Sequence, residues 1–105
     1  MDDNLLEQFK QYTILCVEDE DGIRKRLVNT LKYYFKDVLE ASNGEDGYDL
    51  YLEYKPDIIL SDIEMPNKNG IELIQLIREQ DLHTIIIMVT AYSNEEYLLD
   101  LINLN

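Results

Sequence analysis

Three short, almost continuously apolar runs, each followed at once by a polar side chain, constrain this chain more than any other feature. The runs lie at residues 13–17, 58–61 and 85–89. Such a run is typical of a strand with both faces covered, as in a parallel sheet. The first run is followed by Glu18 and Asp19, the second by Asp62 and the third by Thr90. We therefore expect two acidic strand ends and one hydroxyl strand end to share a rim of one sheet.

Helical segments alternate with the predicted strands. We expect strands at residues 12–17, 37–41, 57–61 and 84–89. We expect helices over residues 20–35, from the capping box 42–45 to about residue 54, over residues 70–79 and over residues 93–102. This alternation with short connections implies a parallel sheet with helices on both faces. The predicted fold class is α/β, a doubly wound parallel sheet, in which ligands bind outside the carboxyl ends of the strands.

Side-chain patterns within the expected helices make more local predictions. In the box Ser42–Glu45, the Ser42 hydroxyl and the Glu45 carboxylate are expected to cover free backbone amides. Asn69 is expected to cap the third helix. Apolar residues at helical spacing are expected to face the core: Ile23, Leu27, Leu31 and Tyr34 in the first helix, Leu50, Tyr51 and Tyr54 in the second, and Ile71, Leu73, Ile74 and Ile77 in the third. Residues 4–11 predict a short helix in an N-terminal extension over residues 1–11.

The charge balance and the single cysteine exclude several classes of protein. The formal net charge is −13, which argues against direct binding to nucleic acid or to an anionic membrane. Cys16 stands alone, so no disulfide can form within the chain, which fits a reducing compartment. No apolar stretch approaches the roughly 20 residues of a membrane span, and the N-terminus lacks the basic start of a signal peptide. We therefore expect a cytoplasmic protein without a membrane partner.

The acidic strand ends indicate a site for a divalent cation. Magnesium prefers hard oxygen ligands, usually one or two carboxylates together with waters and phosphate oxygens. Glu18, Asp19 and Asp62 supply three carboxylates from adjacent strand ends. Each has a simpler interpretation by itself: Asp19 as a helix N-cap, Glu18 as a solvated loop acid, and Asp62 as a residue that starts a turn. Their combination favours the cation.

Asp62 is also suited to chemistry at phosphorus. A carboxylate can attack phosphorus and form an acyl phosphate, provided that the charge on the equatorial oxygens is neutralised. The Thr90 hydroxyl and the backbone amides of Ile63 and Ala91 are candidates to contact those oxygens. Ala91 is small, which leaves room for a phosphoryl group. By itself, Thr90 has the simpler interpretation of a strand-end hydroxyl bonded to the backbone.

Four stretches of the sequence carry a resemblance to a known family. They are Val17–Glu20, Asp57–Pro66, Asn69–Leu73 and Val89–Ala91. Over about residues 12–104, the chain resembles the receiver domain of bacterial response regulators, which act in two-component phosphorelay signal transduction. The resemblance implies the flavodoxin-like strand order 2-1-3-4(-5). It also implies a phosphoprotein signalling domain that is not an enzyme, beyond self-phosphorylation on an aspartate and slow autodephosphorylation.

The resemblance implies a role for each residue that matches the family's motifs. Asp62 matches the phosphoacceptor, and Thr90 matches the switch hydroxyl that moves toward the phosphoryl group. The implied cofactor is Mg²⁺, or Mn²⁺ in its place. Its ligands would be the carboxylates of Asp19 and Asp62, the backbone carbonyl of Glu64 and, through water, Glu18.

Further residues match positions that adjust the rate and choose the partner. Glu64 and Tyr92 lie two residues beyond Asp62 and Thr90, where the family tunes phosphorylation and dephosphorylation. The implied partner is a sensor histidine kinase or a histidine phosphotransfer protein. It would dock on the helix that carries Arg24, Lys25 and Arg26, although these side chains can also be read as a solvated basic face.

The sequence departs from the family's pattern at its end. That pattern continues with a fifth strand ending in a Lys-Pro pair and then a fifth helix, whereas this sequence stops at Asn105. We therefore expect a receiver domain over residues 12–105 that is truncated, lacks the phosphate-pairing lysine and has no output domain here. Lys68 is too near Asp62 in the sequence to replace that lysine. The strand at 84–89 is then expected to be an edge that pairs or swaps elements with a second copy.

Two other functions stay open on the sequence alone. The first is a binding or dimerisation module of the same fold that works without phosphorylation, which the absent lysine favours. The second is an aspartate-nucleophile phosphatase of the haloacid dehalogenase type. That class places a second aspartate two residues after the nucleophile, where this chain has Glu64. The phosphatase therefore ranks below the other two functions.

Overall fold

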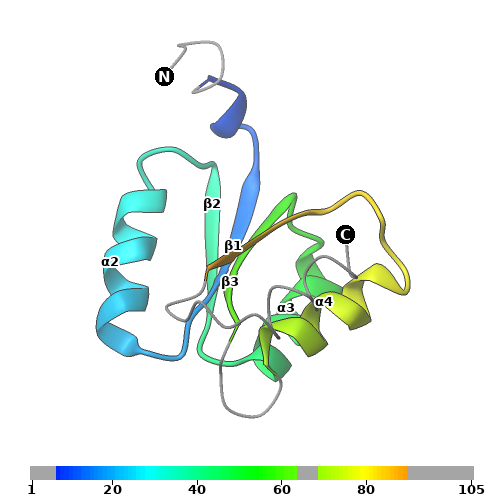
Figure 1. Ribbon diagram of the computed structural model, residues 1–105. Helices are drawn as coiled ribbons and strands as arrows, with labels where there is room; N and C mark the ends of the chain where they lie inside the picture. Colours follow the sequence, from blue (N-terminus) through cyan, green and yellow to red (C-terminus); the bar gives the residue numbers. More distant parts are fainter. Residues whose placement is uncertain (1–6, 64–68, 90–105) are drawn as a thin grey trace.

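Four parallel strands form the sheet at the centre of the computed structural model, which describes residues 7–63 and 69–89 (Figure 1). They are β1 (Thr13–Val17), β2 (Asp37–Ala41), β3 (Ile58–Asp62) and β4 (Ile85–Val89). Their order across the sheet is β2-β1-β3-β4, and all neighbouring pairs are parallel. The predicted doubly wound sheet with the order 2-1-3-4 is confirmed.

Three helices cover the two faces of this sheet within the described residues. α2 (Asp21–Leu31) lies on one face, over β1 and β2, while α3 (Gly44–Tyr54) and α4 (Gly70–Arg78) lie together on the other face (Figure 1). Residues 7–9 form a short helical turn. The expected helix at residues 93–102 and the start of the N-terminal extension lie outside the described residues.

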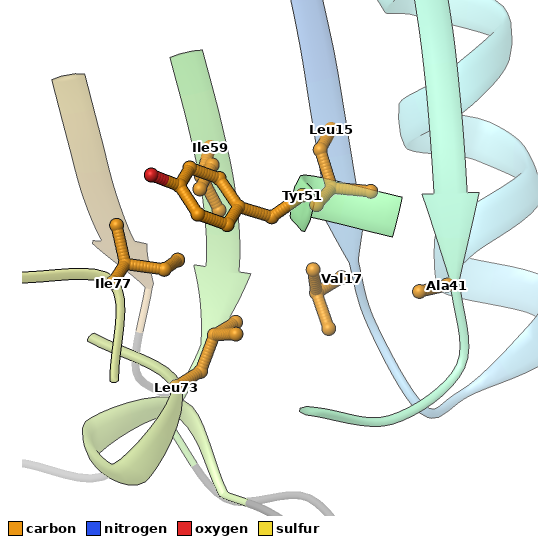
Figure 2. Close-up of a cluster of buried hydrophobic side chains, with 7 residues drawn as sticks. All are labelled: Leu15, Val17, Ala41, Tyr51, Ile59, Leu73 and Ile77. Carbon is orange, nitrogen blue, oxygen red and sulfur yellow. The ribbon is translucent and has the colours of Figure 1, made fainter. Parts of the chain in front are cut away.

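The core lies between the sheet and the layer formed by α3 and α4. Figure 2 shows seven buried side chains from both layers: Leu15, Val17, Ala41, Tyr51, Ile59, Leu73 and Ile77. Alternate strand residues reach this face because successive side chains of a strand point to opposite sides. The four apolar residues predicted to face the core from α4 are all buried. Each buried side chain of this size contributes about 1.5–3 kcal/mol, so the core holds α4 firmly beside β3.

The opposite face of β1 carries Ile14 and Cys16, which are 2% and 1% exposed. Cys16 pairs with Glu40 of β2 on one side and with Leu60 of β3 on the other. Burial, with a smaller effect of the nearby carboxylates of Glu18 and Glu40, raises the pKa of the Cys16 thiol to about 11. Cys16 is therefore a small core residue.

α2 is shorter and less buried than the sequence predicted. It ends at Leu31 instead of residue 35, Val28 is its only buried residue, and Tyr34 is exposed. The other members of the predicted apolar stripe are half-buried: Ile23, Leu27 and Leu31. Beyond α2, the ring of Phe35 stacks on that of Phe9 with 5.2 Å between the centroids. The Phe35 amide still donates to the Leu31 carbonyl at 3.0 Å, and the Lys36 amide donates to the Tyr12 carbonyl at 3.0 Å, so the chain leaves α2 through hydrogen-bonded turns that lead it back to the start of β1.

The cap of α3 lies one residue later than predicted. The side-chain oxygen of Asn43 accepts a hydrogen bond from the Asp46 backbone amide at 2.8 Å, and the Asn43 amide donates to the Asp46 carboxylate at 3.0 Å. Ser42 and Glu45 were the expected pair. Because the helix begins at Gly44, the residue directly before it is the one whose side chain reaches the free amides.

One predicted core residue of α3 faces solvent. Tyr51 is 1% exposed and Leu50 is half-buried, but Tyr54 is 54% exposed. Tyr54 is the last helical residue, and Lys55 takes a left-handed conformation with φ of 46°. Pro56, which follows, is buried, and the Asp57 amide donates to the Thr13 carbonyl of β1 at 2.9 Å. The helix therefore ends just before Pro56, as expected from the missing amide of proline.

β4 forms one edge of the described sheet, and its two faces differ. Ile86 packs against the core, whereas Ile85, Ile87 and Val89 on the other face are about half exposed. The unbroken apolar run predicted cover on both faces. Within the described residues α2 extends only over β1 and β2, which leaves this face of β4 uncovered. The expected edge is present, and pairing with a second copy stays a prediction.

Candidate functional site

Three carboxylates meet where β1 and β3 end. Glu18, Asp19 and Asp62 each place one carboxylate oxygen so that the three oxygens lie within 4.8 Å of one another. The strand register explains this meeting, because Val17 pairs with Ser61 and the chain leaves both strands in the same direction. The sequence expected these acidic strand ends to share a rim, and the structure brings them together there.

Burial and mutual repulsion change the proton affinity of this cluster. Glu18 is 8% exposed, Asp62 is half-buried and Asp19 is exposed. Burial, followed by the hydrogen bond with Asp19 and the negative charge of Asp62, raises the pKa of Glu18 to about 7. The Glu20 backbone amide, which donates to Glu18 at 3.5 Å, opposes this rise. Three oxygen ligands whose full ionisation is unfavourable form a suitable environment for a hard divalent cation.

The backbone around Asp62 holds its carboxylate at the end of β3. The Ile63 amide donates to the Asp62 carboxylate at 2.7 Å, and the Ser61 hydroxyl donates to the Asp62 carbonyl at 2.9 Å. Asp62 also pairs with Val89 across β3 and β4, and the Ile63 amide lies 3.3 Å from the Val89 carbonyl oxygen. The Ile63 amide, which the sequence analysis proposed as a contact for a phosphoryl group, is thus directed at the Asp62 carboxylate.

Gly70 brings the start of α4 against this backbone. Its amide donates to the Ile63 carbonyl at 2.7 Å. A Cβ at Gly70 would overlap the main-chain oxygen of Asp62 and lie only 2.9 Å from the Ile63 Cα. Asn69 caps the helix as predicted, since its side chain accepts from the Glu72 amide at 3.0 Å. In the sequence, Gly70 stands out only as part of the Asn69–Leu73 motif, and its position directly after a helix cap is the signal for this close approach.

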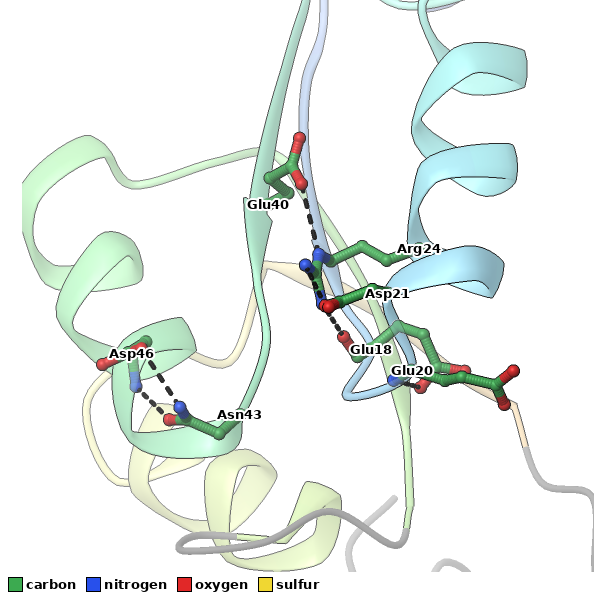
Figure 3. Close-up of polar contacts among 7 residues, drawn as sticks. All are labelled: Glu18, Glu20, Asp21, Arg24, Glu40, Asn43 and Asp46. Atoms are coloured by element: carbon green, nitrogen blue, oxygen red, sulfur yellow. Dashed lines mark hydrogen bonds and ion pairs between the residues drawn. The ribbon is translucent and has the colours of Figure 1, made fainter.

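The structure places Arg24 differently from the sequence prediction, which put it on a basic face of the first helix. Figure 3 shows its guanidinium turned from α2 toward the end of β1 and toward β2. It donates to the Glu18 backbone carbonyl at 2.8 Å, to the Asp21 carboxylate at 2.6 Å and to the Glu40 carboxylate at 3.2 Å. Its side chain is 14% exposed. Within the predicted basic face of the helix, Arg24 is therefore an internal contact and not a free surface charge.

Several predicted site residues lie outside the described ranges. These are the residue whose carbonyl was expected to bind metal and the switch hydroxyl with its two successors: Glu64, Thr90, Ala91 and Tyr92. Their parts in the site stay predictions. None of the helices in residues 7–63 and 69–89 is long and apolar enough to cross a membrane.

Comparison with known proteins agrees with the fold. The family model described as the response regulator receiver domain matches residues 14–105. The chain belongs to this family. Receiver domains are signalling domains and not classical enzymes, so the phosphatase interpretation is not supported.

The receiver domain is similar to curated proteins of different lengths. It is 39% identical to the chemotaxis protein CheY of Halobacterium salinarum, over 79% of this chain and 69% of that protein. It is 34% identical to the regulatory protein AtoC of Escherichia coli, over 79% of this chain but only 18% of that protein. The receiver domain thus spans less than a fifth of the longer relative.

A solved structure supports the same architecture. The N-terminal domain of an uncharacterized protein, WS1339, from Wolinella succinogenes superposes on this receiver domain with a TM-score of 0.86 and 32% sequence identity. The superposition covers 90% of this chain and 76% of that one.

Proposed function

We propose that this receiver domain accepts a phosphoryl group on Asp62 from a sensor histidine kinase or a histidine phosphotransfer protein. The observation that carries the proposal is the meeting of Glu18, Asp19 and Asp62 at the ends of two adjacent strands, with oxygens within 4.8 Å of one another. A lone acidic residue at a strand end has many ordinary explanations, but three at one rim of this fold have few. We place this exchange in the cytoplasm.

The donor set fits a hard divalent cation. Three carboxylates at one place, one of them with a pKa raised to about 7, favour the binding of a cation that offsets their repulsion. Mg²⁺, or Mn²⁺, would be held by Asp19, Asp62 and the Glu64 carbonyl, with Glu18 acting through water. Such an ion would supply positive charge against the phosphoryl oxygens during transfer.

The chain's own groups then have defined tasks. A carboxylate oxygen of Asp62 forms the new bond to phosphorus while the bond from phosphorus to the donor's histidine nitrogen breaks, and its electron pair stays on that nitrogen. The Ile63 amide, 2.7 Å from the Asp62 carboxylate, lies close enough to contact a phosphoryl oxygen once the acyl phosphate forms. The Ala91 amide and the Thr90 hydroxyl are proposed to contact the remaining oxygens.

The phosphoryl group is proposed to act as a switch and to be lost slowly. Movement of the Thr90 hydroxyl toward the phosphoryl group would convert the chemistry at Asp62 into a change of conformation. Glu64 and Tyr92 would set how fast water removes the group. The domain in this proposal turns over no substrate other than its own acyl phosphate.

Intact-mass measurement tests the proposal directly. The protein is incubated with Mg²⁺ and a small phosphodonor such as acetyl phosphate. We expect a mass increase of one phosphoryl group in the wild type and in Asp49→Asn, which removes an exposed carboxylate of α3, but none in Asp62→Asn. No adduct in the wild type, or an adduct in Asp62→Asn, would contradict the proposal.

A second candidate is a binding module of the same fold that works without phosphorylation. The half-exposed Ile85, Ile87 and Val89 on one face of β4 favour it, because apolar side chains of this size are usually covered. Calorimetry separates the two functions. Absence of both the adduct and Mg²⁺ binding in a folded wild-type protein would support the binding module.

A further inference from the structure

Among the described residues few contacts hold the loop that carries Glu18 and Asp19, and the bond within it, from the Glu20 amide to the Glu18 carboxylate, is long at 3.5 Å. The loop ends in Glu20, the residue before α2, whose side chain makes no capping hydrogen bond. The Glu18 amide donates to the Ala41 carbonyl at 3.0 Å, which fixes only the start of the loop. Three nearby carboxylates repel one another, so a poorly held loop would relax away from Asp62.

Arg24 provides a further contact that fixes this loop. From the first turns of α2 its guanidinium reaches back six residues and donates to the Glu18 carbonyl at 2.8 Å. The Asp21 and Glu40 carboxylates accept its other donors, so the planar fork is fixed from two sides (Figure 3). Asp21 is 80% exposed and Glu40 is 47% exposed, so these ion pairs contribute little stability by themselves. The partly buried contact to Glu18 is the one that reaches the site.

We propose that Arg24 is a positioning residue for the acidic site, holding the Glu18 carbonyl so that the Glu18 and Asp19 carboxylates stay beside Asp62. This inference rests on the proposed function, since it concerns the same cation site. It differs from a role in docking a kinase, because the guanidinium is turned inward and bonded on three sides.

The direction in which the Mg²⁺ affinity changes distinguishes a positioning role of Arg24 from a purely electrostatic one. Removing a positive charge near three carboxylates should, by Coulomb's law alone, tighten the binding of Mg²⁺. Releasing the Glu18 carbonyl should instead weaken it, because the ligands are no longer assembled before the ion arrives. Loss of a residue that orients metal ligands typically costs 10–100-fold in metal affinity. We therefore expect Arg24→Met to bind Mg²⁺ roughly 10-fold more weakly.

Arg24→Lys keeps the positive charge but removes the planar guanidinium group and its fixed set of N–H donors. A single ammonium group is a point charge that cannot serve three acceptors in the geometry of a guanidinium. Charge alone predicts unchanged Mg²⁺ affinity in this variant, whereas positioning predicts weaker binding. Lys32→Met is the matched control: it removes a positive charge at the opposite end of α2, and we expect its Mg²⁺ affinity to stay close to that of the wild type.

Calorimetric titration with Mg²⁺ at fixed pH and ionic strength tests the four proteins, with unfolding midpoints in a chelator as a second readout. Weaker binding in Arg24→Lys and Arg24→Met, with both variants folded, is the expected result. Unchanged or tighter binding in both would overturn the role of Arg24 and leave the proposed function intact. Loss of the folded state in both variants would assign Arg24 to folding and also overturn the positioning role. A wild type that binds no Mg²⁺ would overturn the proposed function and this inference together.

Discussion

Gly70 and Asp62 touch through their backbones, so a side chain at the first position of α4 would overlap the main-chain oxygen of the candidate phosphoacceptor. The nearest other atoms would be the Met88 Cε at 2.6 Å and the Ile63 Cα at 2.9 Å. Met88 can move, but the two backbone groups cannot shift without also moving the Asp62 carboxylate. The glycine therefore sets how closely α4 approaches the site.

We expect Gly70→Ala to lower the free energy of unfolding by about 1–3 kcal/mol, the usual cost of overpacking. We also expect it to weaken Mg²⁺ binding. Gly22→Ala is the matched control, because a Cβ there would meet nothing within 4 Å and alanine favours the helix by about 0.8–1 kcal/mol. Urea unfolding followed by circular dichroism measures both variants. A Gly70→Ala variant as stable as Gly22→Ala would show that the contact is easily relieved.

The raised pKa of Glu18 predicts a pH dependence for the metal-free protein. Below about pH 7 the folded state keeps a proton on Glu18, whereas the unfolded chain releases it near pH 4.5. Because the folded state then binds more protons than the unfolded state, the contribution of Glu18 to stability falls as the pH rises from about 4.5 to about 7. Glu18→Gln should remove this part of the pH profile.

Unfolding midpoints between pH 5 and 8, recorded in a chelator, measure this effect. Glu45→Gln, which changes an exposed carboxylate in the first turn of α3, should keep the wild-type profile. Adding Mg²⁺ at pH 7.5 should raise the wild-type midpoint, since a ligand that binds only the folded state stabilises it. Identical profiles for wild type and Glu18→Gln would contradict the raised pKa.

Asp81 predicts a second pH dependence, of the opposite sign. Its carboxylate accepts hydrogen bonds from the hydroxyls of Thr84 and Tyr51 and from the amides of His83 and Thr84. These bonds, the Thr84 hydroxyl first, hold the pKa of Asp81 well below its usual range. The stability that they contribute is present above the unfolded pKa of about 3.9 and is lost as the pH falls below it.

We expect Asp81→Asn to be less stable than the wild type at pH 7 and to lose less stability on acidification from pH 4 to pH 2. Asp49→Asn serves as the control, because that exposed carboxylate makes none of these contacts. Thermal unfolding at pH 7, 4, 3 and 2 gives the comparison. Parallel acid profiles for wild type and Asp81→Asn would mean that the carboxylate is not held as the contacts indicate.

The structure and the sequence pattern give different capping residues for α3, and this difference can be tested. Asn43→Ala should cost about 1 kcal/mol of unfolding free energy, because the Asp46 amide loses its acceptor. Ser42→Ala should cost much less. Urea unfolding of the two variants in parallel is sufficient, and a larger loss for Ser42→Ala would restore the capping box that the sequence suggested.

The positions of the strands and the acidic rim follow from the sequence for a physical reason, whereas the strand order was implied by the resemblance to the receiver family. Continuous apolar runs mark strands whose position hardly depends on neighbours, and parallel strands carry their ends to the same rim. Helix details depend on contacts between distant residues instead. After α2 the Phe35 ring stacks on that of Phe9 and the Lys36 amide donates to the Tyr12 carbonyl, and periodicity within the helix contains no information about these contacts.

The sequence did not predict the positions of Gly70 and Arg24, and both residues contact backbone atoms. Gly70 matters because it has no side chain, and Arg24 matters because it reaches a main-chain carbonyl. Neither effect can be read from residue type alone, since each requires knowing which backbone atoms lie nearby. The exposed face of β4 is similar: its residues are as apolar as those of β3, and among the described elements α2 lies over β1 and β2 and not over this face.

The buried thiol of Cys16 allows opening of the structure around β1 to be followed by covalent labelling. Its thiol is 1% exposed, its pKa is raised to about 11, and the chain has no other cysteine. A thiol reagent reacts with the thiolate, so it can modify this protein only when an opening of the structure exposes the buried face of β1 that carries Cys16. Under conditions where reclosing is fast, the labelling rate reports the fraction of molecules that are open. A ligand that binds the closed rim would lower that fraction, so the rate of covalent labelling would measure occupancy of a site several residues away without any added probe.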